Sequence, residues 1–423
     1  MAEIDVEQQR QFAVAVVQQL RSTGFEAYWA GGCVRDQLLG RTPKDYDVAT
    51  NATPPEIRDV FGRRRTLAIG AAFGVVTVLG PPGAGPIEVA TFRRDDGYSD
   101  GRHPDTVTFT SAEEDALRRD FTVNGLFYDP VNEQVIDYVG GREDIERRVL
   151  RAIGDPKDRF TEDKLRMLRA VRLTSTLAFA LDAPTVEAIQ EMAGEISVVS
   201  AERIAAEVER MLSDPNRSTA VQLLRDTGLL AAILPAGLPL PDEPAWSHSI
   251  EVLNRLVTTS FAPALAVLLN AFTDHGMAPM VARHWRLSNA DTERACWLIA
   301  NWTALEDAEQ RSWPVLQRIL IHDGAAELLA IFDARVAAGQ ASAADAAFVH
   351  QRYAWPTQQL DPPPLITGDD LIQHGLRPGK QFKEYLDAAR DAQLLGDLTT
   401  LDEALDFVRK LSGPDDGSGG SVE

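Results

Sequence analysis

One stretch of sequence decides the fold and the chemistry of this chain: Gly31-Gly32-Cys33-Val34-Arg35-Asp36-Gln37-Leu38-Leu39-Gly40, followed by Asp45-Tyr46-Asp47. Aspartates two residues apart on a strand point to the same face of a sheet. Two carboxylates on one face can hold a divalent metal, and a Gly-Gly turn lets backbone amides approach a phosphate closely. Together these features predict a site that binds a nucleoside triphosphate and moves its phosphoryl group, whereas the acidic pair alone would also fit a solvated turn.

The residues around this stretch predict a small mixed α/β domain that runs to about residue 150. Helical periodicity covers residues 5–23, and Thr53 is the expected N-cap of another helix with prolines in its first turn. A short helix is expected over residues 34–39, and strands over residues 25–30, 46–49 (with the carboxylates), 75–79 and 87–91. From Arg159 onward helices dominate, at 161–177, 184–194, 200–213 and 216–227, so the fold class is α+β.

Composition limits the classes of protein that fit. The chain has 423 residues, 44% of them hydrophobic, which is enough for about two to four domains with cores. Neither a signal peptide nor an apolar run long enough to span a bilayer is apparent. The two cysteines, Cys33 and Cys296, lie far apart, so we expect a cytoplasmic protein without a disulfide.

The charge distribution is uneven along the chain. A net charge of −21, from 42 basic and 63 acidic residues, argues by itself against a polyanionic partner. Arginines nevertheless concentrate in the first 175 residues, from Arg63-Arg64-Arg65 to Arg172. Since salt screens charges beyond roughly 8–10 Å, a local basic track can still serve a nucleic acid. Ordinary surface charge is the alternative interpretation.

Two further segments suit phosphoryl transfer. Glu88, on the strand at 87–91, could supply a third carboxylate, since two-metal sites often use three, although it could also face solvent. In Arg118-Arg119-Asp120-Phe121-Thr122-Val123-Asn124, the arginines suit a triphosphate because their planar forks donate several hydrogen bonds. The alternative is an Arg–Asp pair that only fixes a helix start.

The segment Arg159 to Arg172 carries a second kind of signal. We expect Thr161 to cap a helix on which Asp163, Arg166, Arg169 and Arg172 recur every three residues along one stripe. A carboxylate beside a guanidinium offers both an acceptor and a donor, which could read the Watson–Crick edge of a base. A salt-bridged surface helix would show the same spacing.

Taken in order, these segments closely resemble the class II tRNA nucleotidyltransferases, the CCA-adding enzymes of the polymerase-beta nucleotidyltransferase superfamily, which also contains bacterial poly(A) polymerases. Gly31-Gly32-x-Val34-Arg35-Asp36 with Asp45-x-Asp47 is similar to the catalytic motif of that family, and Arg118 to Asn124 to its second motif. Glu162-Asp163-x-x-Arg166 is similar to its base-reading motif, and Glu202-Arg203-Ile204-x-x-x-Glu207 to the helical motif that follows. Residues 96–104 resemble the flexible loop of members that add the full CCA, and residues 365–382 resemble the tRNA-holding tail of bacterial members.

The resemblance implies a role for each matching residue. Asp45 and Asp47 would hold Mg²⁺ and, with Glu88 assisting, form the catalytic set. Phosphates would contact Gly31, Gly32, Arg35 and Arg119. Asp163 and Arg166 would pair with cytosine or adenine, supported by Arg169 and Arg172. In the tail, Lys380 and Lys383 are the candidate tRNA contacts.

The chain also departs from some relatives. Many carry a metal-dependent His-Asp phosphohydrolase core in the helical body, and here His248 and Asp274 occupy a similar frame. Asn270-Ala271 stands where the adjacent His-Asp pair would be, so we expect no hydrolase activity. The sequence after the catalytic motif resembles the tRNA-directed branch more than the poly(A) polymerases.

The expected protein is an enzyme that adds CMP and AMP to the tRNA 3′ end from CTP and ATP, releasing pyrophosphate, without a membrane or an obligate protein partner. Alternatives are a CC-adding, an A-adding or a poly(A)-adding enzyme, and, from another class, a catalytically silent nucleotide- or RNA-binding regulator. The expected division is a nucleotidyltransferase head at 1–155, a neck with the base-reading motif at 156–215, a body with the degenerate His-Asp region at 216–355, a tRNA-binding tail at 356–412 and a disordered end at 413–423.

Overall fold

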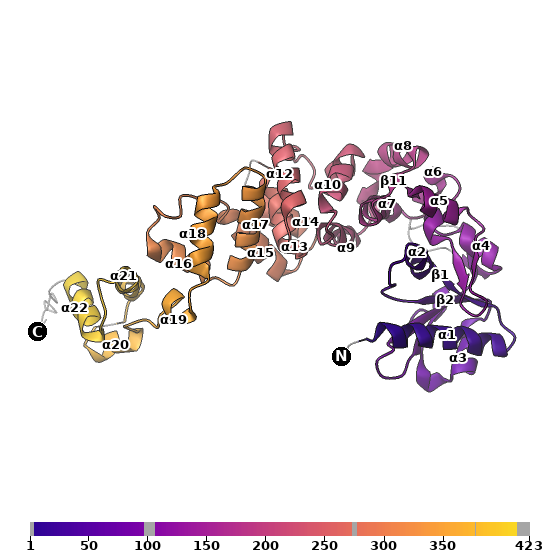
Figure 1. Cartoon of the computed structure of the whole chain (residues 1–423), viewed down its shortest axis with the longest axis horizontal. Coiled ribbons are helices and arrows are strands. Elements are labelled where there is room, and N and C mark those ends of the chain that lie inside the picture. The colour runs from indigo at the N-terminus through magenta and orange to yellow at the C-terminus, as the bar shows by residue number, and fades with distance from the viewer. Residues whose placement is uncertain (1–3, 97–105, 273–276, 377, 413–423) are drawn as a thin grey trace, which may run out of the picture. The chain divides into compact units, whose positions relative to one another are not determined.

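The computed structural model describes residues 4–96, 106–272, 277–376 and 378–412. The chain folds into two compact units, one made of Met1–Leu240 with Pro279–Ser288, the other of Pro241–Ala278 with Asn289–Glu423. Figure 1 shows a sheet-containing head near the N-terminus, followed by helices. The α+β fold class is confirmed, while the finer division into head, neck, body and tail stays a prediction.

The head is built on a mixed sheet. Within the described residues it has seven strands in the order β3-β4-β5-β2-β1-β8-β9. Its parallel pair is β2 with β5, and the other neighbours are antiparallel. The strand bounds are β1 Ala27–Ala30, β2 Asp47–Thr50, β3 Thr66–Leu67, β4 Val75–Leu79, β5 Pro86–Thr91, β8 Phe127–Asp129 and β9 Gln134–Ile136. Two short pairs stand apart, β6 Arg93–Asp96 with β7 Thr106–Phe109, and β10 Val149–Leu150 with β11 Ala180–Leu181.

Helices cover both faces of this sheet. The helices of the head are α1 Val6–Ser22, α2 Gly32–Leu38, α3 Pro54–Phe61, α4 Ala112–Leu117 and α5 Gly141–Arg147. Helices α1 and α3 pack on one face (Figure 1). On the other face, Ala112 and Ala116 of α4 join Phe92 and Phe127 in a buried cluster. The predicted start of α3 is confirmed, because Thr53 and Glu56 form a capping box and prolines occupy the first turn.

The rest of the first unit is helical, apart from β11. Its helices are α6 Pro156–Glu162, α7 Leu165–Leu177, α8 Ala183–Met192, α9 Ala201–Leu212, α10 Arg217–Asp226 and α11 Leu229–Ile233, joined by most of α14 Met277–His284. The expected continuous helix over 161–177 is wrong, since Asp163 has an extended backbone (φ −147°, ψ 106°) that separates α6 from α7. Thr161 therefore lies inside α6, whose N-cap is Asp155, which accepts a hydrogen bond from the Lys157 amide.

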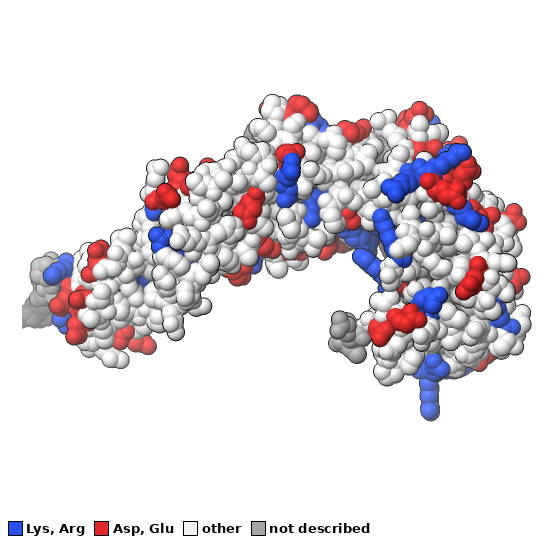
Figure 2. Space-filling view, viewed as in Figure 1, with Lys and Arg blue, Asp and Glu red and all other residues white. Residues whose placement is uncertain are grey.

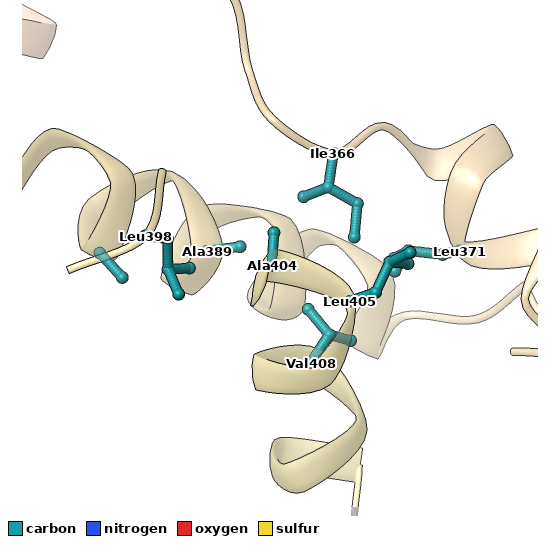
Figure 3. Packing of buried hydrophobic residues seen from close by; sticks show 8 residues of the cluster. Ile366, Leu371, Ala389, Leu398, Ala404, Leu405 and Val408 are labelled. Atoms are coloured by element: carbon teal, nitrogen blue, oxygen red, sulfur yellow. The ribbon is translucent and has the colours of Figure 1, made fainter. Parts of the chain in front are cut away.

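In the second unit the described regular elements are helices. Their bounds are α12 Glu243–Arg255, α13 Phe261–Asn270, α15 Asn289–Ala300, α16 Trp313–Leu320, α17 Ala325–Ala337, α18 Ala343–Tyr353, α19 Thr357–Leu360, α20 Gly368–Gln373, α21 Gln381–Leu395 and α22 Leu401–Ser412. The last three share a small core in which Ile366, Leu371, Leu405 and Val408 are buried (Figure 3). Among all described helices, none is long and apolar enough to cross a membrane.

Candidate active site

A cavity of about 600 Å³ in the first unit gathers residues from distant parts of the sequence. Its lining consists of Gly31, Gly32, Arg35, Asp45, Asp47, Arg118, Arg119, Asp120, Asn124, Asp163, Arg166, Arg169, Arg172 and Leu173. Most of the residues predicted from sequence therefore meet at one place. Glu88 is not part of this lining, and Lys380 and Lys383 belong to the second unit.

The Gly-Gly turn forms one wall. Gly31 has φ +77°, which favours glycine, and a Cβ there would lie 3.1 Å from Nη1 of Arg119. Arg35, one turn into α2, donates to Oδ1 of Asn124 at 2.6 Å and to Oδ1 of Asp36 at 2.8 Å. The two glycines and the held guanidinium of Arg35 therefore line the cavity together.

Asp45 and Asp47 are two residues apart in the sequence, but they do not lie on the same strand. Asp47 is the first residue of β2, whereas Asp45 belongs to the loop before it, so the prediction that a strand carries both was wrong. They nevertheless line the same cavity. Glu88 is the register partner of Asp47 on β5, so the two side chains project from one face of the sheet.

The carboxyl of Asp47 is difficult to ionise. Partial removal from water, followed by the negative charges of Asp45 and Glu88, raises its pKa from 3.8 to about 6, while Arg119 acts in the opposite direction. The Asp47 side chain stays partly open to solvent, so a cation could reach it. A bound cation would offset the repulsion from the negative charges of Asp45 and Glu88. Local excess negative charge of this kind is what a divalent metal compensates.

Two arginines of the cavity, Arg118 and Arg119, are held by a carboxylate that the sequence analysis missed. Asp115 of α4 is buried and accepts from Nη2 of Arg118 at 2.6 Å and from Nη2 of Arg119 at 2.9 Å. Burial alone would raise the pKa of Asp115, but the two guanidinium groups outweigh it and lower the pKa. The available signal was the spacing of three and four residues from Asp115 to the arginine pair.

Asp120 links the head to α7. It accepts from Nη2 of Arg169 at 2.7 Å and from Nδ2 of Asn124 at 3.1 Å. Burial opposes ionisation of Asp120, yet the Arg169 charge and these hydrogen bonds lower its pKa to about 2. Because Asn124 also holds Arg35, this network connects the Gly-Gly turn, the second motif and the base-reading helix.

Asp163 and Arg166 line the cavity but do not pair with each other. Oδ2 of Asp163 accepts from Nη2 of Arg203 at 2.7 Å, and Arg166 forms a salt bridge with Glu162. Arg166, Arg169 and Arg172 lie on α7, and Asp163 precedes that helix, so the four-residue helical stripe was predicted correctly only for the arginines. Arg172 donates to the buried Glu207 at 2.6 Å.

The described residues contain no group of three or more His, Cys, Asp and Glu side chains arranged to hold a metal by themselves. Asp45 and Asp47 are the two carboxylates that line the cavity without a salt bridge in the described part of the chain. Such a pair leaves room for substrate oxygens to complete the coordination of a hard cation. The donor set therefore fits a divalent metal bound together with a phosphate substrate.

The candidate residues in the second unit lie in other surroundings. Lys380 precedes α21 and lines a cavity of about 640 Å³ with His374, Tyr385 and Arg409, while Lys383 is exposed on α21. His248 lines a cavity of about 470 Å³ together with Asn270 and Ala271. Asp274, residues 97–104 of the predicted flexible loop and the predicted disordered end at 413–423 lie outside the described residues, whereas Asp96 is the last residue of β6. On the visible face, basic and acidic side chains are interspersed (Figure 2).

Comparisons with known sequences match most of the chain. Residues 27–151 match the poly A polymerase head domain, residues 178–238 a probable RNA and SrmB binding site of polymerase A, and residues 258–408 the tRNA nucleotidyltransferase domain 2. The CCA-adding enzyme of Lactobacillus helveticus is 34% identical over 93% of this chain and 95% of its own length. That of Geobacillus kaustophilus is 35% identical over 89% of this chain and 90% of its own length.

Solved structures agree with the sequence matches. The Bacillus stearothermophilus CCA-adding enzyme in complex with CTP has a TM-score of 0.77 at 29% identity, covering 96% of this chain and 98% of its own. The Thermotoga maritima CCA-adding enzyme complexed with tRNA shares the fold, with a TM-score of 0.68 at 21% identity and 94% coverage of both chains. The resemblance drawn from the motifs is thus confirmed along nearly the whole length, and the chain belongs to the family of CCA-adding enzymes.

Proposed function

We propose that this enzyme adds CMP and AMP to the 3′ end of tRNA, using CTP and ATP and releasing pyrophosphate. One observation supports the proposal: a single cavity joins the Gly-Gly turn, two carboxylates, the arginines that we propose bind the triphosphate, and the pair Asp163 and Arg166. The relatives named above, one with CTP and one with tRNA, support the same substrates.

The reaction forms a bond between the ribose 3′-oxygen of the tRNA and the α-phosphorus of the triphosphate. The bond from that phosphorus to the bridging oxygen breaks, and pyrophosphate leaves. We propose that Glu88, the register partner of Asp47 in the sheet, helps to draw the hydroxyl proton away, directly or through water. The cavity's arginines neutralise charge on the triphosphate, and Asp115 keeps Arg118 and Arg119 aimed at it.

Enzymes that transfer nucleotidyl groups generally use a divalent cation, and we propose Mg²⁺ here, held by Asp45 and Asp47. When bound, the cation would polarise the phosphoryl group and stabilise charge on the attacking and leaving oxygens. The chain's own contribution is to present two carboxylates, one at the start of β2 and one just before it, without competing salt bridges in the described residues.

Base choice falls to Asp163 and Arg166. Cytosine and adenine both present an amino donor next to a ring-nitrogen acceptor, which one carboxylate and one guanidinium can satisfy together. Uracil and guanine present a carbonyl in place of the amino group, so a polar group of the cavity is left unpaired, at a cost of roughly 1–3 kcal/mol.

A product-sizing experiment tests this function. The protein is incubated with tRNA lacking its last one, two or three nucleotides, with each labelled triphosphate alone and with CTP plus ATP. With CTP plus ATP, we expect the tRNAs that lack one, two and three nucleotides to be extended by one, two and three nucleotides, so that each ends in CCA. Extension that stops after CC, or that adds only A, would identify a partial enzyme, and a long A tract would identify a poly(A) polymerase. No extension at all would leave only a nucleotide- or RNA-binding role.

A further inference from the structure

Asp163 is held in place by two donors, and each takes one oxygen of its carboxylate. The backbone amide of Leu165 donates to Oδ1 at 3.0 Å, and Nη2 of Arg203 donates to Oδ2 at 2.7 Å. A carboxylate offers about four acceptor positions, so both oxygens retain capacity for a further donor such as the amino group of a base. The direction in which Asp163 presents that capacity is set by Leu165 and Arg203.

Arg203 acts from outside the cavity. It lies on α9, forty residues beyond Asp163 in sequence, and is not among the residues that line the cavity. Four residues further along α9, and therefore on the same helical face, Glu207 accepts from Nε of Arg172 at 2.6 Å. Glu207 is 2% exposed, so this bond is well shielded from water. One face of α9 thus holds both Asp163, through Arg203, and Arg172, through Glu207.

The local backbone makes Asp163 depend on this support. It sits in the extended break between α6 and α7, where its amide donates to the carbonyl of Arg159 and its carbonyl accepts from the amide of Arg166. These bonds hold the backbone, so the direction of the side chain depends on its own two donors. Arg166, in contrast, has partners that do not involve Arg203, because it bonds to Glu162 and donates to the carbonyl oxygens of Arg159 and Arg118 at 3.2 Å. Losing Arg203 would leave the Asp163 carboxylate with the Leu165 amide alone, while Arg166 keeps its own partners.

We propose that Arg203 is a positioning residue for base selection: it aims the Asp163 carboxylate at the amino group of cytosine or adenine without touching the nucleotide. This rests on the proposed function. A recognition group must be held within a fraction of an ångström to discriminate, and its support is part of the specificity. A freed carboxylate satisfies the correct base less well, so the preference over uracil and guanine shrinks.

The test measures kcat and KM for all four triphosphates on tRNA lacking its terminal nucleotides. Three variants are compared with the unmodified chain: Arg203→Met, Arg203→Lys and, as the matched control on α9, Glu202→Gln, whose exposed side chain pairs with Arg286 instead. In Arg203→Met we expect the preference for CTP over UTP to fall about tenfold, mainly through a higher KM for CTP. Its kcat at saturating CTP should stay within about threefold. Arg203→Lys should restore part of the preference, and Glu202→Gln should keep all of it.

The outcomes separate the possibilities. An Arg203→Met protein with an unaltered preference, or with all four kcat/KM values reduced by one common factor, would overturn the role of Arg203. If Arg203→Met fails to fold, Arg203→Lys against Glu202→Gln decides, and identical preferences in those two would also overturn it. If the unmodified chain incorporates neither CMP nor AMP, the proposed function fails instead, which is a distinct result.

Discussion

At the residue scale, Asp47 shows how neighbouring charges prepare a carboxylate for a cation. Removal from water, and after it the charges of Asp45 and Glu88, make its ionisation unfavourable in the folded chain, and Arg119 compensates only in part. Since its pKa of about 6 lies above its ordinary 3.8, the folded state holds more protons than the unfolded state between these values. This carboxyl therefore makes the fold less stable as the pH rises from about 4 to 6, and a bound cation would offset the part of the penalty that comes from the like charges.

Metal affinity should consequently depend on pH through Asp47. Below pH 6 a proton competes with the cation, so the apparent dissociation constant for Mn²⁺ should rise, approaching about tenfold per pH unit. Titration calorimetry with Mn²⁺ between pH 5 and 8 measures this. Glu88→Gln removes one negative neighbour and should move the midpoint to lower pH. An affinity that stays constant from pH 5 to 7 would show that Asp47 does not bind the metal.

At the element scale, sequence predicted best what local bonds decide. The start of α3 was predictable because its capping box and its prolines lie within four residues of one another. The break between α6 and α7 was not, because helix-forming residues flank Asp163 on both sides and its ion pair comes from Arg203 on another helix. For the same reason the partners of Asp163 and Arg166 could not be read from their spacing.

Helix α4 illustrates a support that looks like surface charge in the sequence. Asp115 stands in the acidic run Glu113-Glu114-Asp115, yet only Asp115 among them is buried. Its lowered pKa means that it contributes stability above its unfolded pKa, and this is lost as the pH falls through the folded value. Helix α4 thus packs Ala112 and Ala116 into the core of the head, and its Asp115 holds Arg118 and Arg119 in position.

Asp115→Asn should damage stability and triphosphate binding together. Two guanidinium groups would lose their shared counter-charge, so we expect the free energy of unfolding to fall by about 2–3 kcal/mol, since both arginines keep some solvent exposure. The KM for CTP and ATP should rise. Urea unfolding and steady-state kinetics measure the two effects, with Glu113→Gln, at an exposed position, as control on the same helix. Equal stability and KM in both variants would contradict the proposed role of Asp115.

At the scale of the whole molecule, net charge was a poor guide to partner. The chain carries −21 overall, and basic and acidic side chains are interspersed on the face in Figure 2, yet the cavity itself is rich in arginine. The same local argument applies to the tail, whose own core of Ile366, Leu371, Leu405 and Val408 supports α20, α21 and α22. A tail with its own core can present Lys380 and Lys383 to a polyanion despite the global charge.

We expect the double variant Lys380→Glu/Lys383→Glu to bind tRNA more weakly and with less dependence on salt. Each lost phosphate contact should lower the slope of log affinity against log salt by about 0.7–0.9. Filter binding at several salt concentrations measures this, with Lys410→Glu on α22, which makes half of the charge change, as the comparison and CTP binding as the control for the active site. If the double variant behaves like Lys410→Glu, the two lysines do not hold tRNA.

The most direct test of the account compares the unmodified chain with Asp45→Ala on tRNA that lacks its three terminal nucleotides. With CTP, ATP and Mg²⁺, the unmodified chain should lengthen the tRNA by CCA, while Asp45→Ala should add neither CMP nor AMP, although thermal unfolding shows it folded and filter binding shows that it still takes up tRNA. Loss of a metal ligand should cost several kcal/mol of transition-state stabilisation. Near-normal extension by folded Asp45→Ala would show that the chemistry does not take place in this cavity.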